Sequence, residues 1–290
     1  MTTQAGNEGQ PSTTPVIDFR VRPSTARILA AMSPTGEAMT GINRWGHQMP
    51  TPVPSIDEFV KVLDTHGIDR VVFTGRQWGV GSDARGTTND LVAETVAAHP
   101  DRITGYASAD LRTGVTASIR ELRRAIDELH LSGISVDPFW YEFSADDRRL
   151  YPAYELASEH GVPVVITVGP LIDAEWADPT PIDRVAADFP ETKFLLSHGC
   201  YPYVTELVGL GYRRSNVYFE PSLYYALPGS EPFIKAAKGF LQDRIIFASA
   251  YPLAPLDIKD HFAEVYDLSG ELRDKLLGGN AAAFLGLDAS

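Results

Sequence analysis

Short apolar, β-branched runs alternate with helix-like stretches along most of the chain, and this alternation constrains the fold most strongly. The runs are Val16–Val21, Arg70–Phe73, Ile103–Ala107, Gly133–Val136, Val162–Val168, Lys193–Leu196, Val217–Phe219 and Arg244–Phe247. Continuous apolar runs of this length are typical of parallel strands that are buried on both faces. Strand then helix, repeated eight times, predicts an α/β fold in which the strands close into a (β/α)8 TIM barrel.

The intervening stretches carry helix signals. Residues 55–66 open with a Ser-x-x-Glu capping box at Ser55, and apolar residues recur three and four apart in Val115–Leu129. The other predicted helices are Asn89–Ala98, Leu150–His160, Ile182–Asp188, Val204–Leu210 and Pro232–Phe240, with further helices in Asp257–Asp288. An open doubly wound sheet is the competing fold, but no glycine-rich phosphate loop follows Val16–Val21.

The chain has 290 residues, and a barrel of this kind typically takes about 250. No linker-like change in composition interrupts the alternation, so we predict one barrel domain over residues 16–290. Residues 1–15 are polar and predict a disordered tail. Residues 23–54 form an insertion after the first strand, where Trp45 and His47 contribute either to a lid over the catalytic face or to a passive surface loop.

Composition excludes several classes of partner. Asp and Glu number 38 against 25 Lys and Arg, so the net charge of -13 repels phosphate backbones and anionic lipid surfaces, and we expect neither nucleic acid nor membrane as a partner. No apolar run reaches the roughly 18 residues of a membrane span, and residues 1–15 lack a signal-peptide layout. The single cysteine, Cys200, excludes an intramolecular disulfide and suits a cytoplasmic location.

Catalytic groups in such a barrel project from the carboxyl ends of the strands. The candidate catalytic residues at these positions are His198, Asp137 and Glu220. The candidate substrate-binding residues are Arg20, Arg22, Arg76, Tyr141, Trp140, Thr167 and Tyr251.

The first strand places two arginines close together. Side chains alternate along a strand, so Asp18, Arg20 and Arg22 are predicted on one face, and if that face is the lumen of the barrel the two guanidiniums are poorly solvated. A buried guanidinium keeps its proton and costs free energy unless an anion pairs with it. Two alternatives stay open: neutralisation by internal carboxylates, or binding of a ligand carboxylate or phosphate by at least one arginine. The candidate internal partners are Asp18, Asp110, Asp137 and Glu220.

A series of motifs carries a family resemblance. They are Val16–Arg22, Asp146–Leu156, Gly161–Gly169, Phe194–Gly199, Asn216–Ser222, Arg244–Pro252 and Gly279–Leu285. In this order they resemble the amidohydrolase superfamily, in the branch that contains aminocarboxymuconate semialdehyde decarboxylase. The resemblance implies a distorted (β/α)8 barrel, often dimeric, whose usual members bind a divalent metal and catalyse hydrolysis or non-oxidative decarboxylation.

This chain departs from the family pattern at the metal-ligand positions. Arg20 and Arg22 replace the two histidines of the first strand, Thr167 replaces the histidine of the fifth, and Ala250 replaces the aspartate of the eighth, which leaves only His198. Zinc needs about three or four neutral or anionic ligands, and two permanent cations would repel it. We therefore predict no catalytic metal and no other cofactor.

The remaining groups predict a metal-independent enzyme on a small anionic substrate that is carboxylated and aromatic or unsaturated. A decarboxylase-type lyase is favoured: the arginines fix the carboxylate, and His198, or Asp137 or Glu220 with a pKa raised by burial, moves the proton. The alternatives are a hydrolase of the same family, in which a carboxylate or histidine activates water, and a non-catalytic binding barrel. From the resemblance we also expect a homodimer.

Overall fold

The computed structural model describes residues 14–32, 48–170 and 174–287. Parallel strands form two sheets: β1 (Ile17–Asp18), β2 (Arg70–Thr74) and β5 (Ile103–Tyr106) in one, and β6 (Ile134–Val136), β7 (Val164–Thr167), β8 (Phe194–Ser197) and β9 (Val217–Glu220) in the other. A single bridge from Ala107 to Ile134 joins the two sheets, and another from Phe219 to Ile245 joins β9 to residues 244–247. The amide of Phe19 donates to the carbonyl of Phe247 at 3.1 Å, which closes the ring. The predicted barrel is confirmed, and residues 244–247 occupy the position of its eighth strand, between β9 and β1.

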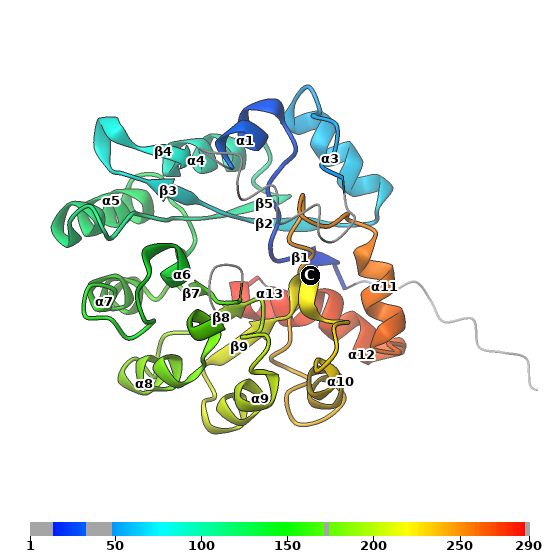
Figure 1. The fold of residues 1–290 in the computed structure, drawn as a ribbon. Coiled ribbons are helices and arrows are strands. Elements are labelled where there is room, and N and C mark those ends of the chain that lie inside the picture. The colour runs from blue at the N-terminus through cyan, green and yellow to red at the C-terminus, as the bar shows by residue number, and fades with distance from the viewer. Residues whose placement is uncertain (1–13, 33–47, 171–173, 288–290) are drawn as a thin grey trace, which may run out of the picture.

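Helices surround the strands (Figure 1). Those of the outer ring are α3 (Ile56–Thr65), α4 (Asn89–Ala98), α5 (Val115–Asp127), α7 (Tyr151–His160), α8 (Thr180–Asp188), α9 (Val204–Arg213), α10 (Glu231–Ala237) and α11 (Ile258–Val265). Shorter pieces are α1 (Ala26–Ala31), α6 (Pro138–Tyr141), α12 (Gly270–Asp274), the π-helical turn η5 (Lys275–Gly279), α13 (Asn280–Leu285), and the 3-10 turns η2 (Gly81–Asp83), η3 (Ala174–Ala177) and η4 (Ser222–Tyr224). Each helix predicted between strands is present within a few residues of its predicted bounds. None of the helices among the described residues is long and apolar enough to cross a bilayer.

Side-chain caps begin α3 and α4, and the sequence predicts the first of them, at Ser55. Ser55 Oγ accepts from the backbone N–H of Glu58 at 3.2 Å, and Thr88 Oγ1 accepts from that of Leu91 at 3.3 Å. The first N–H groups of a helix have no partner within the helix, so these caps satisfy donors that would otherwise need water.

Apolar side chains fill one end of the barrel. Phe19 packs edge-to-face on Tyr106 and on Phe284 of α13, with ring centroids 5.8 and 5.3 Å apart. Lys193, which immediately precedes β8, donates to the carbonyls of Ala283 and Phe284, so α13 covers the amino ends of the strands. The opposite, carboxyl end of the lumen is therefore the end left for polar side chains.

The first strand is less regular than predicted. It ends at Asp18, and the chain bends at Phe19 and Arg20. Phe19 packs in the apolar cluster inside the barrel, while Arg20 reaches Thr167 on β7, so strict alternation from Asp18 to Arg22 does not hold.

The segments outside the barrel differ in part from the prediction. Residues 23–54 contain α1, and a bridge from Thr25 to Val53 draws the ends of the insertion together. Trp45, His47 and residues 1–13 of the expected tail lie outside the described residues. The antiparallel hairpin of β3 (Arg76–Trp78) and β4 (Arg85–Thr87), between β2 and α4, was not predicted.

Candidate active site

Strained backbone marks the carboxyl ends of the strands. Four non-glycine residues adopt positive φ there: His198 (74°) and Cys200 (53°) after β8, Ser222 (43°) after β9 and Ala250 (62°) after residues 244–247. Such conformations cost free energy, and in folded proteins they cluster at active sites and ligand clamps. This end of the barrel is the candidate active site.

Arg20 and Arg22 are both buried here, each with 3% of its surface exposed. Arg20 donates from Nη1 to Thr167 Oγ1 at 3.3 Å. Burial lowers the pKa of Arg20, and the carboxyl group of Glu220 opposes this effect. No carboxylate of the described residues lies within 4.0 Å of its guanidinium.

The Arg22 guanidinium has fewer polar contacts than that of Arg20. Within residues 14–32, 48–170 and 174–287 it has neither a hydrogen bond nor an ion pair, although its backbone N–H donates to the carbonyl of Tyr251 at 2.9 Å. Burial, followed by the charges of Arg76 and Arg20, lowers the pKa of Arg22 well below its usual range. Because a guanidinium is too strong a base to lose its proton readily, this arrangement demands an anion.

Arg76 and Asp137 form the ion pair at the edge of the site. Arg76 donates from Nε to Asp137 Oδ2 at 2.8 Å and from Nη2 to Oδ1 at 3.2 Å. Its guanidinium carbon also lies 5.7 Å from the ring centroid of Phe139 and 5.5 Å from that of Trp140. Burial would raise the pKa of Asp137, but Arg76, then Arg20 and a hydrogen bond with Thr167, lower it to about 2. The prediction that burial makes Asp137 a weak acid is therefore wrong.

Glu220 lies fully buried behind the arginines. Its two carboxyl oxygens accept from the hydroxyls of Ser197 and Ser222, and the backbone N–H of His198 lies 3.3 Å from Oε1. Burial raises the pKa of Glu220 to about 7, against the opposing charge of Arg20 and these hydrogen bonds. Its elevated pKa agrees with the prediction, but both oxygens are already occupied.

His198 is partly exposed. It lies near the cationic cluster, which consists of Arg20, Arg22 and Arg76. Its buried Nδ1 has no hydrogen-bond partner among the described residues, and its ring packs edge-to-face on Tyr224 at 5.4 Å. Burial, and then the charges of Arg20, Arg76 and Arg22, lower the pKa of His198 well below 6.5. The imidazole is consequently neutral at pH 7 unless a bound anion offsets those charges.

Two of the expected partners for the arginines are engaged elsewhere. Asp18 Oδ1 accepts from the backbone N–H groups of Arg20 at 3.2 Å and Ser249 at 2.8 Å, so it stabilises the bend after β1. Asp110 accepts two hydrogen bonds from Arg112, each of 2.9 Å. Neither carboxylate neutralises Arg20 or Arg22, which corrects that expectation.

The three aromatic candidate residues also differ in their contacts. Trp140 lies beside Arg76, whereas the Tyr141 hydroxyl donates to the carbonyl of Ala109 at 2.7 Å and Tyr251 packs against Phe59 of α3 at 5.9 Å. The roles of Ser197 and Ser222 around Glu220 were not predicted. Their only signal in the sequence is their position at the ends of two strands.

The donor set does not fit a divalent metal. Across the described ranges, no three His, Cys, Asp or Glu side chains are grouped so that they could hold an ion. Arg20, Arg22 and Thr167 stand at the positions that resemble the family's histidines, and a protonated guanidinium has no lone pair to donate and repels a cation.

Comparison with known proteins places this geometry in a family. Residues 50–287 match the amidohydrolase family. The chain belongs to this family. An uncharacterized TIM-barrel protein from Bordetella bronchiseptica superposes with a TM-score of 0.77 at 30% identity, over 94% of this chain and 98% of that one. A 2,6-dihydroxybenzoate decarboxylase in complex with 2,6-dihydroxybenzoate shares the fold, with a TM-score of 0.68 at 16% identity over 96% of this chain and all (100%) of that one.

Curated relatives match over shorter spans. This amidohydrolase-family chain is 24% identical to a 2-amino-3-carboxymuconate-6-semialdehyde decarboxylase of Dictyostelium discoideum, over 69% of this chain and 66% of the relative. It is 30% identical to a 2-keto-4-carboxy-3-hexenedioate hydratase of Sphingobium, over 38% of this chain and 39% of the relative. The alignments thus span less than two thirds of the length of these relatives.

Proposed function

We propose that this member of the amidohydrolase family is a metal-independent, decarboxylase-type lyase for a small carboxylated substrate that is aromatic or unsaturated. The observation that carries the proposal is the buried guanidinium of Arg22, which has no partner among the described residues and lies close to Arg20. A carboxylate is the natural ligand of such a group, because guanidinium and carboxylate match in charge and in hydrogen-bond geometry.

The charge balance of the site supports a reaction that builds up negative charge. Arg20, Arg22 and Arg76 contribute three cations, while Asp137 is ionised and Glu220 has a pKa of about 7. When carbon dioxide leaves, the electron pair of the broken carbon–carbon bond stays on the substrate, and fixed guanidinium charges stabilise the resulting enolate or phenolate.

A proton must then reach the carbon that lost the carboxylate. His198 is the imidazole placed among the arginines, and a bound anion favours its protonated form by offsetting their charge. In this mechanism His198 protonates the carbon, Arg20 and Arg22 bind the carboxylate, and Arg76 with Thr167 and Trp140 completes the wall of the site.

Addition of water is the second candidate function. It is favoured by the neutral imidazole of His198, which can accept a proton from water, and by the hydratase among the relatives. A barrel that only binds a ligand is the third alternative. Internal ion pairs filling the site would support it, and the guanidinium of Arg22, which has no partner among the described residues, argues against it.

The test is an activity assay combined with metal analysis. Purified protein is incubated with 2,6-dihydroxybenzoate, 5-carboxyvanillate and related carboxylates, and released carbon dioxide and incorporated ¹⁸O from labelled water are measured before and after treatment with a chelator. Carbon dioxide release that survives chelation supports the lyase, whereas ¹⁸O incorporation supports water addition. A bound divalent metal at one ion per chain, whose removal abolishes turnover, would overturn metal independence.

Two further expectations belong to this proposal. The enzyme forms a homodimer and acts in the cytoplasm on a small anionic substrate. Light scattering of the purified protein measures the mass of the assembly, and cell fractionation measures the location.

A further inference from the structure

The hairpin of β3 and β4 carries Arg76 to the edge of the candidate site. It follows β2 directly and extends beyond the barrel near α4 and α5 (Figure 1). Thr87 Oγ1 on β4 accepts from the backbone N–H of Arg76 at 2.7 Å and donates to the Arg76 carbonyl at 3.3 Å. The backbone of Arg76 therefore moves only if the hairpin moves.

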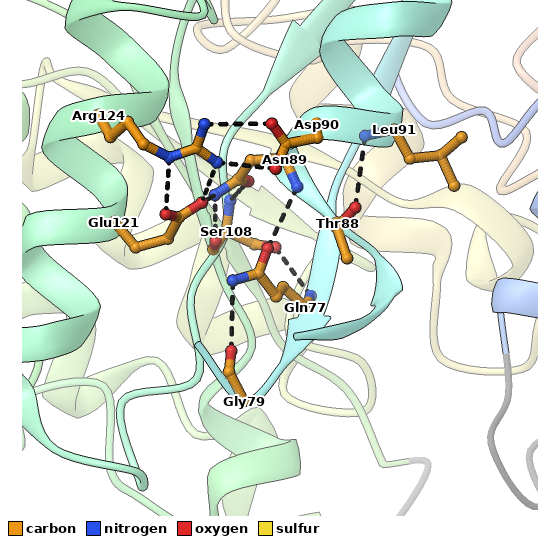
Figure 2. Close-up of polar contacts among 9 residues, drawn as sticks. All are labelled: Gln77, Gly79, Thr88, Asn89, Asp90, Leu91, Ser108, Glu121 and Arg124. Atoms are coloured by element: carbon orange, nitrogen blue, oxygen red, sulfur yellow. Dashed lines mark hydrogen bonds and ion pairs between the residues drawn. The ribbon is translucent and has the colours of Figure 1, made fainter. Parts of the chain in front are cut away.

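A buried polar network fastens this hairpin to the rest of the barrel (Figure 2). Gln77, the neighbour of Arg76, donates from its backbone N–H to Ser108 Oγ at 2.9 Å and from Nε2 to the carbonyl of Gly79 at 3.2 Å. Its Oε1 accepts from the backbone N–H of Asn89 at 3.2 Å. The residue next to Arg76 is thus tied to the loop that follows β5 and to the start of α4.

Asn89 is the centre of the network and is fully buried. Its Nδ2 donates to the carbonyl of Ser108 at 3.0 Å and to Glu121 Oε1 at 2.8 Å, and its Oδ1 accepts from the N–H of Ser108 at 2.8 Å. Arg124 holds Glu121 with two hydrogen bonds of 2.9 Å and is itself held by Asp90. A buried amide with its donors and acceptor satisfied fixes the elements that it joins.

Arg76 needs such support because of its surroundings. Its charge lowers the pKa of both Arg20 and Arg22, so like charges push its guanidinium away from the site. Its side chain is 17% exposed, so the guanidinium has access to water as an alternative to Asp137. Asp137 attracts the guanidinium, but a mobile hairpin would let Arg76 turn outward.

We propose that Asn89 is a positioning residue for Arg76: its side chain fixes Ser108, which holds Gln77 and with it the β3–β4 hairpin over the carboxyl end of the barrel. The functional meaning of this role rests on the proposed function, in which Arg76 is one of the groups around the substrate. Asn89 itself touches none of the residues assigned to substrate.

The test measures the Arg76 side chain without any substrate. In ¹⁵N NMR spectra of the full-length protein, the Arg76 Nε–H donated to Asp137 gives a shifted, slowly exchanging signal, assigned by its loss in Arg76→Lys. We expect Asn89→Ala to move this signal toward that of a free arginine and to speed its exchange with water by roughly tenfold or more. An unchanged signal in folded Asn89→Ala overturns the proposal.

Two more variants separate positioning from general destabilisation. Thr88→Ala removes the adjacent helix cap, the 3.3 Å bond to Leu91, without touching β3, and the Arg76 signal should stay unchanged (Figure 2). If Asn89→Ala does not fold, Gln77→Leu removes the other contact between the hairpin and Asn89, from Gln77 Oε1 to the Asn89 backbone N–H, and should move the signal. Equal changes in Thr88→Ala also overturn the proposal. Because no substrate is used, these results are independent of whether the lyase assay succeeds.

Discussion

Asp137 accepts two hydrogen bonds from Arg76, from Nε at 2.8 Å and from Nη2 at 3.2 Å. The pair occupies Asp137, whose pKa falls to about 2 although burial alone would raise it. Arg20 and Arg22 are left without an ion-pair partner among the residues that the structure describes. Binding capacity for an anion is built into the site by this imbalance.

Replacing Arg22 with methionine should increase the free energy of unfolding and weaken binding of a carboxylate substrate. Removing a buried, unpaired guanidinium is expected to increase the free energy of unfolding by about 1–3 kcal/mol. The same change should weaken binding of a carboxylate substrate by about 2–4 kcal/mol, because a buried charge-assisted contact is lost. Urea denaturation and calorimetric titration measure the two effects. Arg27→Met, at a side chain that is 63% exposed, is the control and should change neither; loss of stability in Arg22→Met would show that the guanidinium has an internal partner.

Asp137→Asn should destabilise the fold. The substitution leaves a mostly buried Arg76 without its counter-charge, and we expect a loss of about 2–4 kcal/mol in the free energy of unfolding. Glu94→Gln breaks an equally short ion pair whose side chains are 63% and 64% exposed, and should cost less than about 1 kcal/mol. Chemical denaturation of both variants tests the difference, and equal losses would contradict it.

Glu220 should make stability depend on pH. Its folded-state pKa of about 7 exceeds the usual 4.5, so the native carboxyl holds its proton more tightly than the unfolded chain does. Its contribution therefore favours folding below about pH 4.5 and is lost as pH rises through about 7, a change of about 3 kcal/mol. Glu220→Gln removes this titration. The variant should gain stability relative to the wild type between pH 5 and 8, as denaturation at a series of pH values would show; parallel curves would mean that Glu220 does not titrate there.

His198→Asn should reduce turnover about 10²–10⁴-fold if the imidazole transfers the proton. Asparagine retains a hydrogen-bonding side chain of similar size but cannot transfer a proton near neutral pH. Steady-state kinetics on a turned-over carboxylate measure the effect, with His160→Asn, at a helix end paired with Asp127, as the control that should leave kcat unchanged. Full activity in His198→Asn would assign this residue a structural role only.

The barrel could be predicted from the sequence because its strands and helices have strong local signals. The run Val162–Val168 is apolar except for Thr167, and Ser55 with Glu58 marks the start of α3, so neither signal depends on distant contacts. The β3–β4 hairpin escaped prediction because its strands are only three residues long, with charged or glycine residues in each. Gln77 of this hairpin contacts Ser108 and Asn89, which lie 31 and 12 residues further along the chain, and no local pattern reveals these contacts.

The site could be predicted only in outline. Strand ends identified Arg20, Arg22 and His198, but the pairing of carboxylates depends on side-chain directions after bends. Asp18 turns to backbone amides and Asp110 to Arg112, while Arg76 captures Asp137 and reverses the expected shift of its pKa. These outcomes follow from distances across the barrel, which residue spacing along the chain does not contain.

The bare guanidinium of Arg22 also has a practical consequence at the bench. Since this buried cation has no partner among the described residues, we expect it to bind small anions from the buffer, and citrate, phosphate or acetate should then compete with a carboxylate substrate and mask weak turnover. Ligands can therefore be found from the melting temperature, because any acid that binds the folded protein stabilises it by mass action. A library of carboxylic acids screened in an anion-poor buffer would rank the chemical relatives of the true substrate before any reaction is known.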